Sequence, residues 1–236
     1  MGQRIDTRPY TSSTLRGHGG LKFEEASIEP ETDDESVIFC HGWRNYASEP
    51  AEQNFQVVEE ALKAEGFDGC FVSWRWKSGL PWRNAIKSAE KEGYRLADYA
   101  EKFYDQNYAE LHIIGYSLGA KAVMEAQKEL AEKDKSFNSI HLMAGAVKSS
   151  DFSDTGLYHT CLKNSQIFNY RSPRDLTLRL LFPLSEALGK QGLETRMEQV
   201  NDCKIGFRCS RRDVHGSYIE KGSRPLSEIA EYLTRD

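Results

Sequence analysis

The 236-residue chain lacks any apolar run near the roughly 18 residues that a membrane-spanning helix needs. It also lacks an excess of basic residues, and its formal net charge is −5. Nucleic acid and anionic membrane surfaces are therefore not expected partners. The first residues, Met1 to Asp6, have no apolar core of the kind found in secretory signals, so we expect a cytoplasmic protein.

Cysteine is scarce, and its spacing matches neither a disulfide framework nor a zinc signature. Cys40 and Cys70 adjoin apolar runs and are predicted to be buried thiols. Cys203 and Cys209 are close enough in sequence to form a bridge, but a reducing compartment opposes one. We therefore expect no structural disulfide and no metal centre.

Short apolar segments alternate with helical patterns along most of the chain. Such segments are typical of strands buried on both faces, and the alternation predicts right-handed crossovers in a mostly parallel sheet. The fold class is therefore α/β, with helices flanking the sheet. The expected strands are 36–40, 70–74, 111–115, 139–143 and 166–170. One helix is expected to begin after Ser48, and three more are expected at about 84–104, 118–132 and 227–233.

The chain shows no internal repeat, low-complexity linker or shift in composition, which favours one domain over residues 21–236. Residues 1–20 are polar and glycine-rich and are predicted to form a flexible arm. A short edge strand is expected at 21–28. Segments 144–164 and 181–201 leave room for at most a small cap.

A five-residue motif, Gly-Tyr-Ser-Leu-Gly at 115–119, lies between an expected strand and an expected helix. This context is typical of a nucleophile elbow, in which a sharp turn raises a serine hydroxyl above the sheet. Small residues must flank such a turn, as Gly115, Gly119 and Ala120 do here. We interpret Ser117 as the nucleophile of a hydrolase, against the alternative of a solvated helix cap.

A His-Gly-Trp turn at 41–43 follows the first buried strand. Its glycine allows the backbone to approach the nucleophile closely. The backbone N–H groups of Trp43 and Leu118 are therefore predicted to form an oxyanion hole. For His41 a structural role in the turn is favoured over catalysis.

A general base is expected late in the chain, because the order in this architecture is Ser, then Asp or Glu, then His. Three histidines follow Ser117. His141 lies within an expected strand, and His159 comes before the last strand, so neither suits the role. His215 lies in a loop before the final helix and is the predicted base.

The acid is expected in a loop that follows a late strand. Asp175 follows the strand that ends at Tyr170, and we predict that it orients the base. Asp151 and Asp154 follow the preceding strand and remain alternatives.

Several aromatic residues are expected near the nucleophile at the carboxyl edge of the sheet. Trp74, Trp76 and Trp82 cluster at the carboxyl end of one strand, and Trp43 follows another. We expect Trp43, Trp74, Trp76 and Tyr116 to contact substrate. Two interpretations stay open: these rings form an acyl or alcohol pocket, or they simply cover the elbow.

Together these motifs resemble those of uncharacterised microbial α/β-hydrolases, especially haloarchaeal ones. The resemblance covers about residues 36–220, and it implies Ser117, Asp175 and His215 as a catalytic triad but supplies no substrate. The chain is less acidic than a salt-adapted relative, and Arg75 stands where relatives often have an acidic residue. The matching segments are His41-Gly42-Trp43, Ser73-Trp74, Asn84-Ala85, Gly115 to Ala120, Asn169 to Asp175, and His215 to Tyr218.

The expected function is hydrolysis of a carboxylic ester, from a small molecule or a lipid, through an acyl-enzyme on Ser117. This chemistry requires neither a metal nor an organic cofactor. The alternative is a non-catalytic protein of the same fold that serves as a binding or structural component of a larger assembly. No feature of the sequence indicates an oligomeric state.

Overall fold

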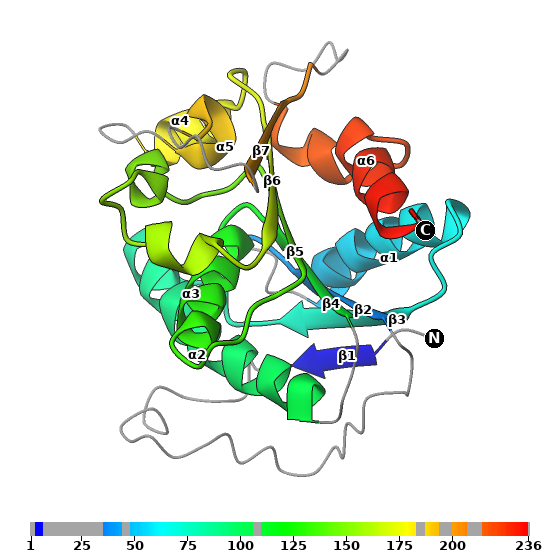
Figure 1. Ribbon diagram of the computed structural model, residues 1–236. Coiled ribbons are helices and arrows are strands. Elements are labelled where there is room, and N and C mark those ends of the chain that lie inside the picture. The colour runs from blue at the N-terminus through cyan, green and yellow to red at the C-terminus, as the bar shows by residue number, and fades with distance from the viewer. Residues whose placement is uncertain are drawn as a thin grey trace.

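A parallel β-sheet forms the centre of the molecule (Figure 1). The computed structural model describes residues 3–6, 35–43, 48–105, 110–182, 187–193, 200–206 and 214–235. Within these residues the sheet has seven strands in the order β1-β3-β2-β4-β5-β6-β7, and every neighbouring pair is parallel. The strands are β1 (Gln3–Asp6), β2 (Glu35–Cys40), β3 (Cys70–Arg75), β4 (Glu110–Tyr116), β5 (Ser139–Met143), β6 (Gln166–Arg171) and β7 (Val200–Lys204).

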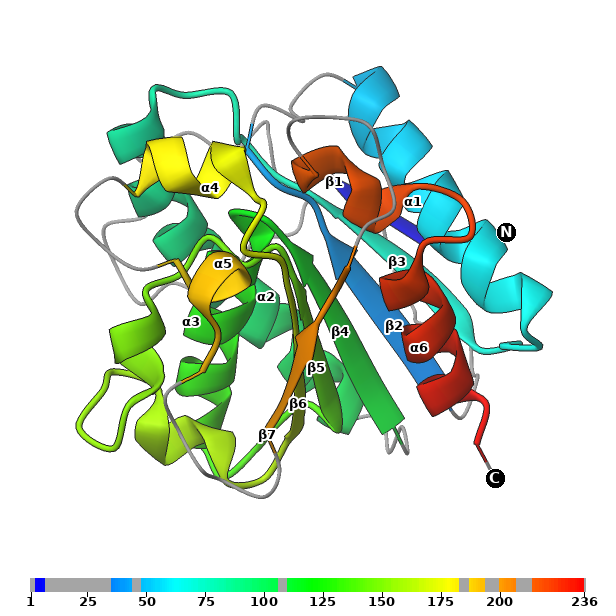
Figure 2. The same ribbon diagram turned by 90° about the horizontal axis from the view of Figure 1, so that it is seen from above.

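Helices cover both faces of this sheet. One face carries α1 and α6, which contact each other, and the opposite face carries α2 and α3 (Figures 1 and 2). This arrangement confirms the predicted α/β class. The helices are α1 (Ser48–Ala64), α2 (Trp82–Asp105), α3 (Gly119–Ala131), α4 (Leu176–Leu181), α5 (Leu188–Gln191) and α6 (Arg224–Leu233), and 3-10 helices cover Ser149–Phe152, His159–Leu162 and His215–Ile219.

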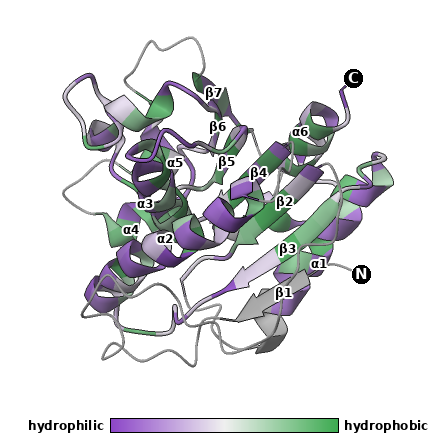
Figure 3. Cartoon of the chain, turned by 60° about the horizontal axis from the view of Figure 1, so that its bottom comes forward, coloured by the Kyte–Doolittle hydropathy of each residue, from purple (hydrophilic) through white to green (hydrophobic). Residues whose placement is uncertain are grey.

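The central strands are buried on both faces, as their continuous apolar runs predict. In β2, Val37 to Cys40 are all buried, and β5 is buried along its whole length. Figure 3 shows hydrophobic residues along β2 and β4, whereas the helices carry hydrophilic residues on part of their surface. Strand β5 has the predicted bounds, and the other central strands differ from prediction by at most one residue at each end.

The two edge strands depart from the predictions. Gln3–Asp6 lies within the stretch expected to be a flexible arm, but it pairs with β3 as strand β1. At the other edge, β7 pairs with β6, although no strand was predicted there. Neither strand has an apolar run in its sequence. A strand at the edge of a sheet does not require one, because it is not enclosed on all sides as a central strand is. The remainder of the arm and the strand expected at 21–28 lie outside the described residues.

The burial of the cysteines and the bounds of the helices agree with the sequence-based predictions in most respects. Cys40 and Cys70 are buried as predicted, and Cys203 is a free thiol; Cys209 lies outside the described residues. Helix α6 begins three residues earlier than predicted, with Pro225 in its first turn, a position that suits proline. None of the described helices has the length and apolar character required to cross a membrane.

His141 lies in the core, as its alternation with apolar residues predicts. Its ring is fully buried and stacks on Phe168 with the ring centroids 4.8 Å apart. Its Nε2 is 2.9 Å from Ser139 Oγ. Burial, and to a lesser extent the charge of His112, holds the pKa of His141 well below its usual range.

This burial predicts a pH dependence of stability. The unfolded chain takes up a proton at His141 below about pH 6.5, while the folded chain does not, so the free energy of unfolding falls as pH decreases below that value. The fall approaches about 1.4 kcal/mol per pH unit for one such group. His141→Phe keeps the stacked ring and removes the titration. Urea unfolding at several pH values should therefore give a smaller loss for the variant, and equal slopes would contradict the prediction.

Candidate active site

A strained backbone turn places Ser117 at the carboxyl edge of the sheet, between β4 and α3. Ser117 has a φ of 53°, in the left-handed region that residues with a Cβ rarely adopt. Its N–H donates to the carbonyl of Met143 at 2.9 Å, and its own carbonyl accepts from the N–H of Ala146 at 2.9 Å. These bonds tie the turn to the end of β5 and to the chain that follows it. This is the conformation that the elbow motif predicts.

Close packing explains why glycines surround the serine. A Cβ on Gly119 would collide with the carbonyl oxygen of Cys40 at the end of β2. A Cβ on Gly42 would lie 2.8 Å from Ser117 Cβ, and one on Gly115 would lie 2.8 Å from Ala120 Cα. The elbow and the His-Gly-Trp turn therefore approach each other as closely as the backbone allows.

Ser117, His215 and Asp175 form a continuous hydrogen-bonded line. The distance from Ser117 Oγ to His215 Nε2 is 2.9 Å, and the distance from His215 Nδ1 to Asp175 Oδ2 is 2.7 Å. The Asp175 side chain is fully buried, whereas that of His215 is 15% exposed. The three predicted residues, which are far apart in sequence, thus lie within hydrogen-bonding distance of one another.

Both oxygens of the Asp175 carboxylate have partners. While Oδ2 faces His215, Oδ1 accepts from the backbone N–H of Leu178 at 2.8 Å. Asp175 is therefore also the N-cap of α4, and the start of this helix fixes its side chain. Together these two hydrogen bonds fix the orientation of the carboxylate.

The two alternative acids lie elsewhere. Asp151 is in a 3-10 helix, where burial raises its pKa and the charges of Lys121 and Lys148 oppose that rise. The Asp154 side chain is 88% exposed, with its Oδ1 3.9 Å from His159 Nδ1. Of the three carboxylates, Asp175 is the one that contacts His215.

The Tyr116 side chain contacts His215 and is not exposed to solvent. Its hydroxyl donates to the carbonyl oxygen of His215 at 2.9 Å, and the two rings lie 5.5 Å apart. The side chain is buried. The predicted substrate contact at Tyr116 is therefore corrected to a contact that positions His215.

His41 fixes the turn after β2, as predicted. Its Nε2 accepts the backbone N–H of Trp76 at 3.2 Å, and its carbonyl accepts Trp76 Nε1–H at 2.9 Å. Because Nε2 is an acceptor, the ring proton belongs on Nδ1, which faces the carbonyl of Gly42 at 2.9 Å. The stacked His41 and Trp76 rings therefore join the ends of β2 and β3.

The predicted oxyanion-hole residues flank Ser117. Leu118 follows Ser117 directly and is the N-cap of α3, so its amide belongs to the helix end whose N–H groups lack intrahelical acceptors. Trp43 follows Gly42, and a Cβ built on Gly42 would lie 3.3 Å from Ser117 Oγ. The turn that carries Trp43 thus packs directly against the serine.

Two of the predicted substrate contacts are wrong. Trp74 and Trp76 are fully buried, and the Trp74 ring packs against Tyr99 of α2. There Trp74 Nε1 donates to Glu92 of α2 at 3.4 Å, while Trp76 covers His41. Both rings support the site from within the core, and neither contributes accessible surface.

A set of aromatic rings extends from Trp43, in the turn that packs against Ser117. Trp43 packs edge-on against Trp82, with centroids 5.2 Å apart, and Trp82 packs against Phe182 at 5.7 Å. All three are partly buried. Trp43 Nε1 also donates to the carbonyl of Leu80 at 2.8 Å, which fixes the orientation of its ring. Sequence reasoning missed Phe182, although it ends an apolar segment that begins just after Asp175.

Comparison with solved structures identifies the fold. The product of the gene lin2722 from Listeria innocua is 10% identical, with a TM-score of 0.51, over 86% of this chain and 95% of that one. Esterase E25 is 13% identical, with a TM-score of 0.52, over 85% of this chain and 69% of that one. No protein-family model and no curated protein matches the sequence. The chain has the α/β-hydrolase fold.

The contact between the elbow and β2 leads to a testable prediction. Gly119→Ala should lower the free energy of unfolding by about 1–3 kcal/mol or more, because its Cβ would overlap a backbone oxygen. Gly145→Ala is a matched control, since that Cβ would have its nearest neighbours at 3.5 Å, an ordinary contact distance. Guanidinium unfolding measures both variants. Equal stability of the two would contradict the packing described here.

Proposed function

We propose that this protein is a serine hydrolase that cleaves carboxylic esters. The observation that carries the proposal is the line of hydrogen bonds from Ser117 Oγ through His215 to Asp175, with distances of 2.9 and 2.7 Å. A serine on a strained strand-to-helix turn, with a histidine and a buried carboxylate behind it, is the arrangement that acyl transfer requires.

The geometry supports a specific first step. Ser117 Oγ attacks the ester carbonyl carbon, and its proton passes to His215 Nε2, which is already within hydrogen-bonding distance. Asp175 keeps Nδ1 protonated and stabilises the imidazolium that forms. Because the Asp175 carboxylate is fixed by the N-terminus of α4, the imidazole is held in the productive orientation before substrate arrives.

The remaining steps use the same groups. The backbone N–H groups of Leu118 and Trp43 would hold the oxyanion, a contribution of about 3 kcal/mol for each donor. His215 returns its proton to the leaving alcohol, and an acyl group stays on Ser117. Water activated by His215 then releases the acid. No step requires a metal or an organic cofactor.

The rings near Ser117 suggest the kind of ester. Trp43, Trp82 and Phe182 offer partly exposed apolar surface to an acyl chain or an aromatic group, and Leu180 on α4 is 79% exposed. Such a surface favours an apolar substrate over a charged one. We therefore propose a small-molecule or lipid ester with an apolar acyl group.

A panel of p-nitrophenyl esters graded by acyl length tests this function. We expect a burst of p-nitrophenol equal to the enzyme concentration, followed by slower steady turnover, because an acyl group accumulates on Ser117. Ser117→Ala should abolish the burst and lower kcat by a factor of about 10⁴ or more. Parallel thioesters and amides define the leaving groups that are accepted.

Folding controls make the result decisive. Circular dichroism and the unfolding midpoint of Ser117→Ala should match the parent protein, because the substitution removes a single oxygen atom and leaves the backbone hydrogen bonds of the turn in place. If a folded parent protein hydrolyses no member of the panel, the function is wrong and a binding role becomes the better explanation. A Ser117→Ala variant that retains activity would also overturn the proposal.

The role of Asp175 can be tested separately. Asp175→Asn keeps the shape of the side chain but disfavours the imidazole tautomer that receives the serine proton, so kcat should fall by about 10⁴. Asp151→Asn, at one of the alternative acids, should leave kcat within a few-fold of the parent value. A large loss in Asp151→Asn with little effect in Asp175→Asn would reverse the assignment.

A further inference from the structure

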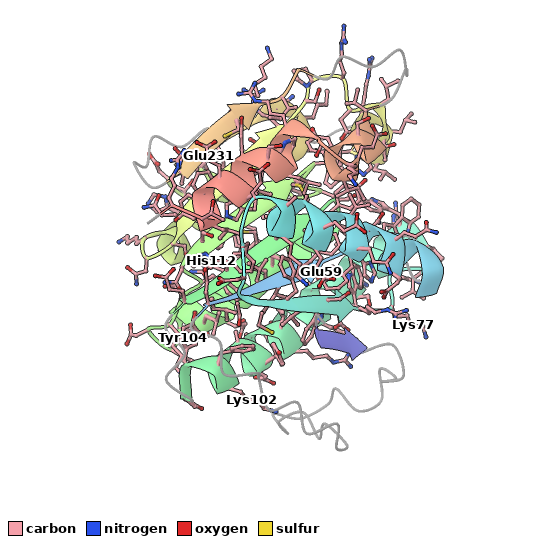
Figure 4. All side chains as sticks on the ribbon, turned by 90° about the vertical axis from the view of Figure 1, so that its right-hand side faces the viewer. Glu59, Lys77, Lys102, Tyr104, His112 and Glu231 are labelled. Atoms are coloured by element: carbon pink, nitrogen blue, oxygen red, sulfur yellow. The ribbon has the colours of Figure 1, made fainter. Side chains whose placement is uncertain are left out.

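A second cluster of polar side chains lies at the opposite edge of the sheet from Ser117. Glu35 is the first residue of β2 and Glu110 the first of β4, and the two are register partners in this parallel pair. His112 lies two residues after Glu110 and therefore on the same face of the sheet. Figure 4 shows His112 at the end of the sheet away from Lys77, which follows β3, and beside α6, on which Glu231 is labelled.

The register of the sheet brings two negative charges together. Glutamates that face each other on neighbouring strands repel and destabilise the pair. Among the described residues, Glu35 Oε1 and Glu110 Oε2 both lie beside His112 Nε2. Their side chains are 27% and 56% exposed, so solvent screens them only in part. The arrangement calls for a cation between the two carboxylates.

The distances fit a metal ion. His112 Nε2 is 3.1 Å from Glu35 Oε1 and 3.2 Å from Glu110 Oε2. The three ligand atoms all lie within 4.8 Å of one another. Tetrahedral ligands that bind Zn²⁺ at about 2.0–2.2 Å lie roughly 3.3–3.6 Å apart, slightly more than these distances. One central ion could therefore contact the histidine and both carboxylates with small side-chain movements.

A second hydrogen bond orients the histidine. The side chain of His112 is only 4% exposed, and its Nδ1 is 2.7 Å from Ser139 Oγ on β5. If Nδ1 donates its proton to Ser139, the Nε2 lone pair points at the two carboxylates. Ser139 can then donate to His141 Nε2, which is 2.9 Å away. Metal-binding histidines are typically held in this way through their other ring nitrogen.

We propose that Glu35, Glu110 and His112 form a binding site for one divalent transition-metal ion, with Zn²⁺ as the preferred ion and water completing its coordination. One imidazole and two carboxylates suit Zn²⁺ or Mn²⁺ better than Ca²⁺, which takes more oxygen ligands. The ion joins the amino ends of β2 and β4 and, through Ser139, reaches β5. Its role is structural, because five residues of extended strand separate His112 from Ser117 by about 16 Å.

Calorimetric titration of the full-length chain tests this site. The protein is treated with EDTA, dialysed, and titrated with ZnCl₂. We expect one ion per chain, and an unfolding temperature that rises by about 5–10 °C when Zn²⁺ exceeds its Kd 100-fold. The Co²⁺ form should show absorption bands of nitrogen and oxygen ligands without thiolate charge-transfer bands, which excludes binding by the cysteines.

Conservative variants locate the ion. Glu110→Gln and Glu35→Gln should each weaken Zn²⁺ binding by at least about 10- to 100-fold. Without metal these variants should unfold at the same temperature as the parent or higher, since the substitution relieves repulsion. Glu231→Gln is the matched control, an exposed glutamate on α6 with the same change in charge, and it should bind Zn²⁺ as the parent does.

Ser117→Ala separates this proposal from the hydrolase activity, because it should bind Zn²⁺ with unchanged affinity. Failure of the metal-free parent protein to bind Zn²⁺, Mn²⁺ or Co²⁺ above background would overturn the site. So would stoichiometric binding that neither Glu110→Gln nor Glu35→Gln weakens. A Zn²⁺ affinity lost in Ser117→Ala would instead place the ion at the serine.

Discussion

The left-handed turn at Ser117 is the constraint on which the rest of the site depends. A non-glycine residue in this conformation costs about 1–3 kcal/mol, and it persists only where its surroundings fix it. Here the backbone of Ser117 bonds to Met143 and Ala146, while Gly119 packs against the end of β2. Strands β2, β4 and β5 thus together hold one hydroxyl at the carboxyl edge of the sheet. The position of this hydroxyl therefore depends on the buried parallel sheet.

The centre of the fold could be predicted because its strands are buried on both faces and so must be continuously apolar. The edges could not. Strand β1, Gln-Arg-Ile-Asp, and strand β7, Val-Asn-Asp-Cys-Lys, each pair with a neighbour on one side only, and neither sequence has an apolar run. Their sequences resemble loops for that reason. Helix α4 escaped precise prediction because it is six residues long and depends on the Asp175 cap.

Sequence reasoning named residues that the structure brings together where motif and chain order constrain them, and it misplaced residues where side-chain direction matters. Ser117, Asp175 and His215 follow from the elbow motif and the order of the elements. Trp74 was misplaced because α2 covers its face of the sheet, so the ring packs against Tyr99 in the core. The cluster of Glu35, Glu110 and His112 depends on strand register, which no local pattern in the sequence specifies.

Covalent labelling at Ser117 tests the central claim most directly. A fluorophosphonate forms a stable bond with a serine only where a neighbouring base activates the hydroxyl. Intact-mass spectrometry should show one phosphonyl group per chain, and peptide mapping should place it on Ser117. Folded protein that stays unlabelled, or a label on another residue, would contradict the account.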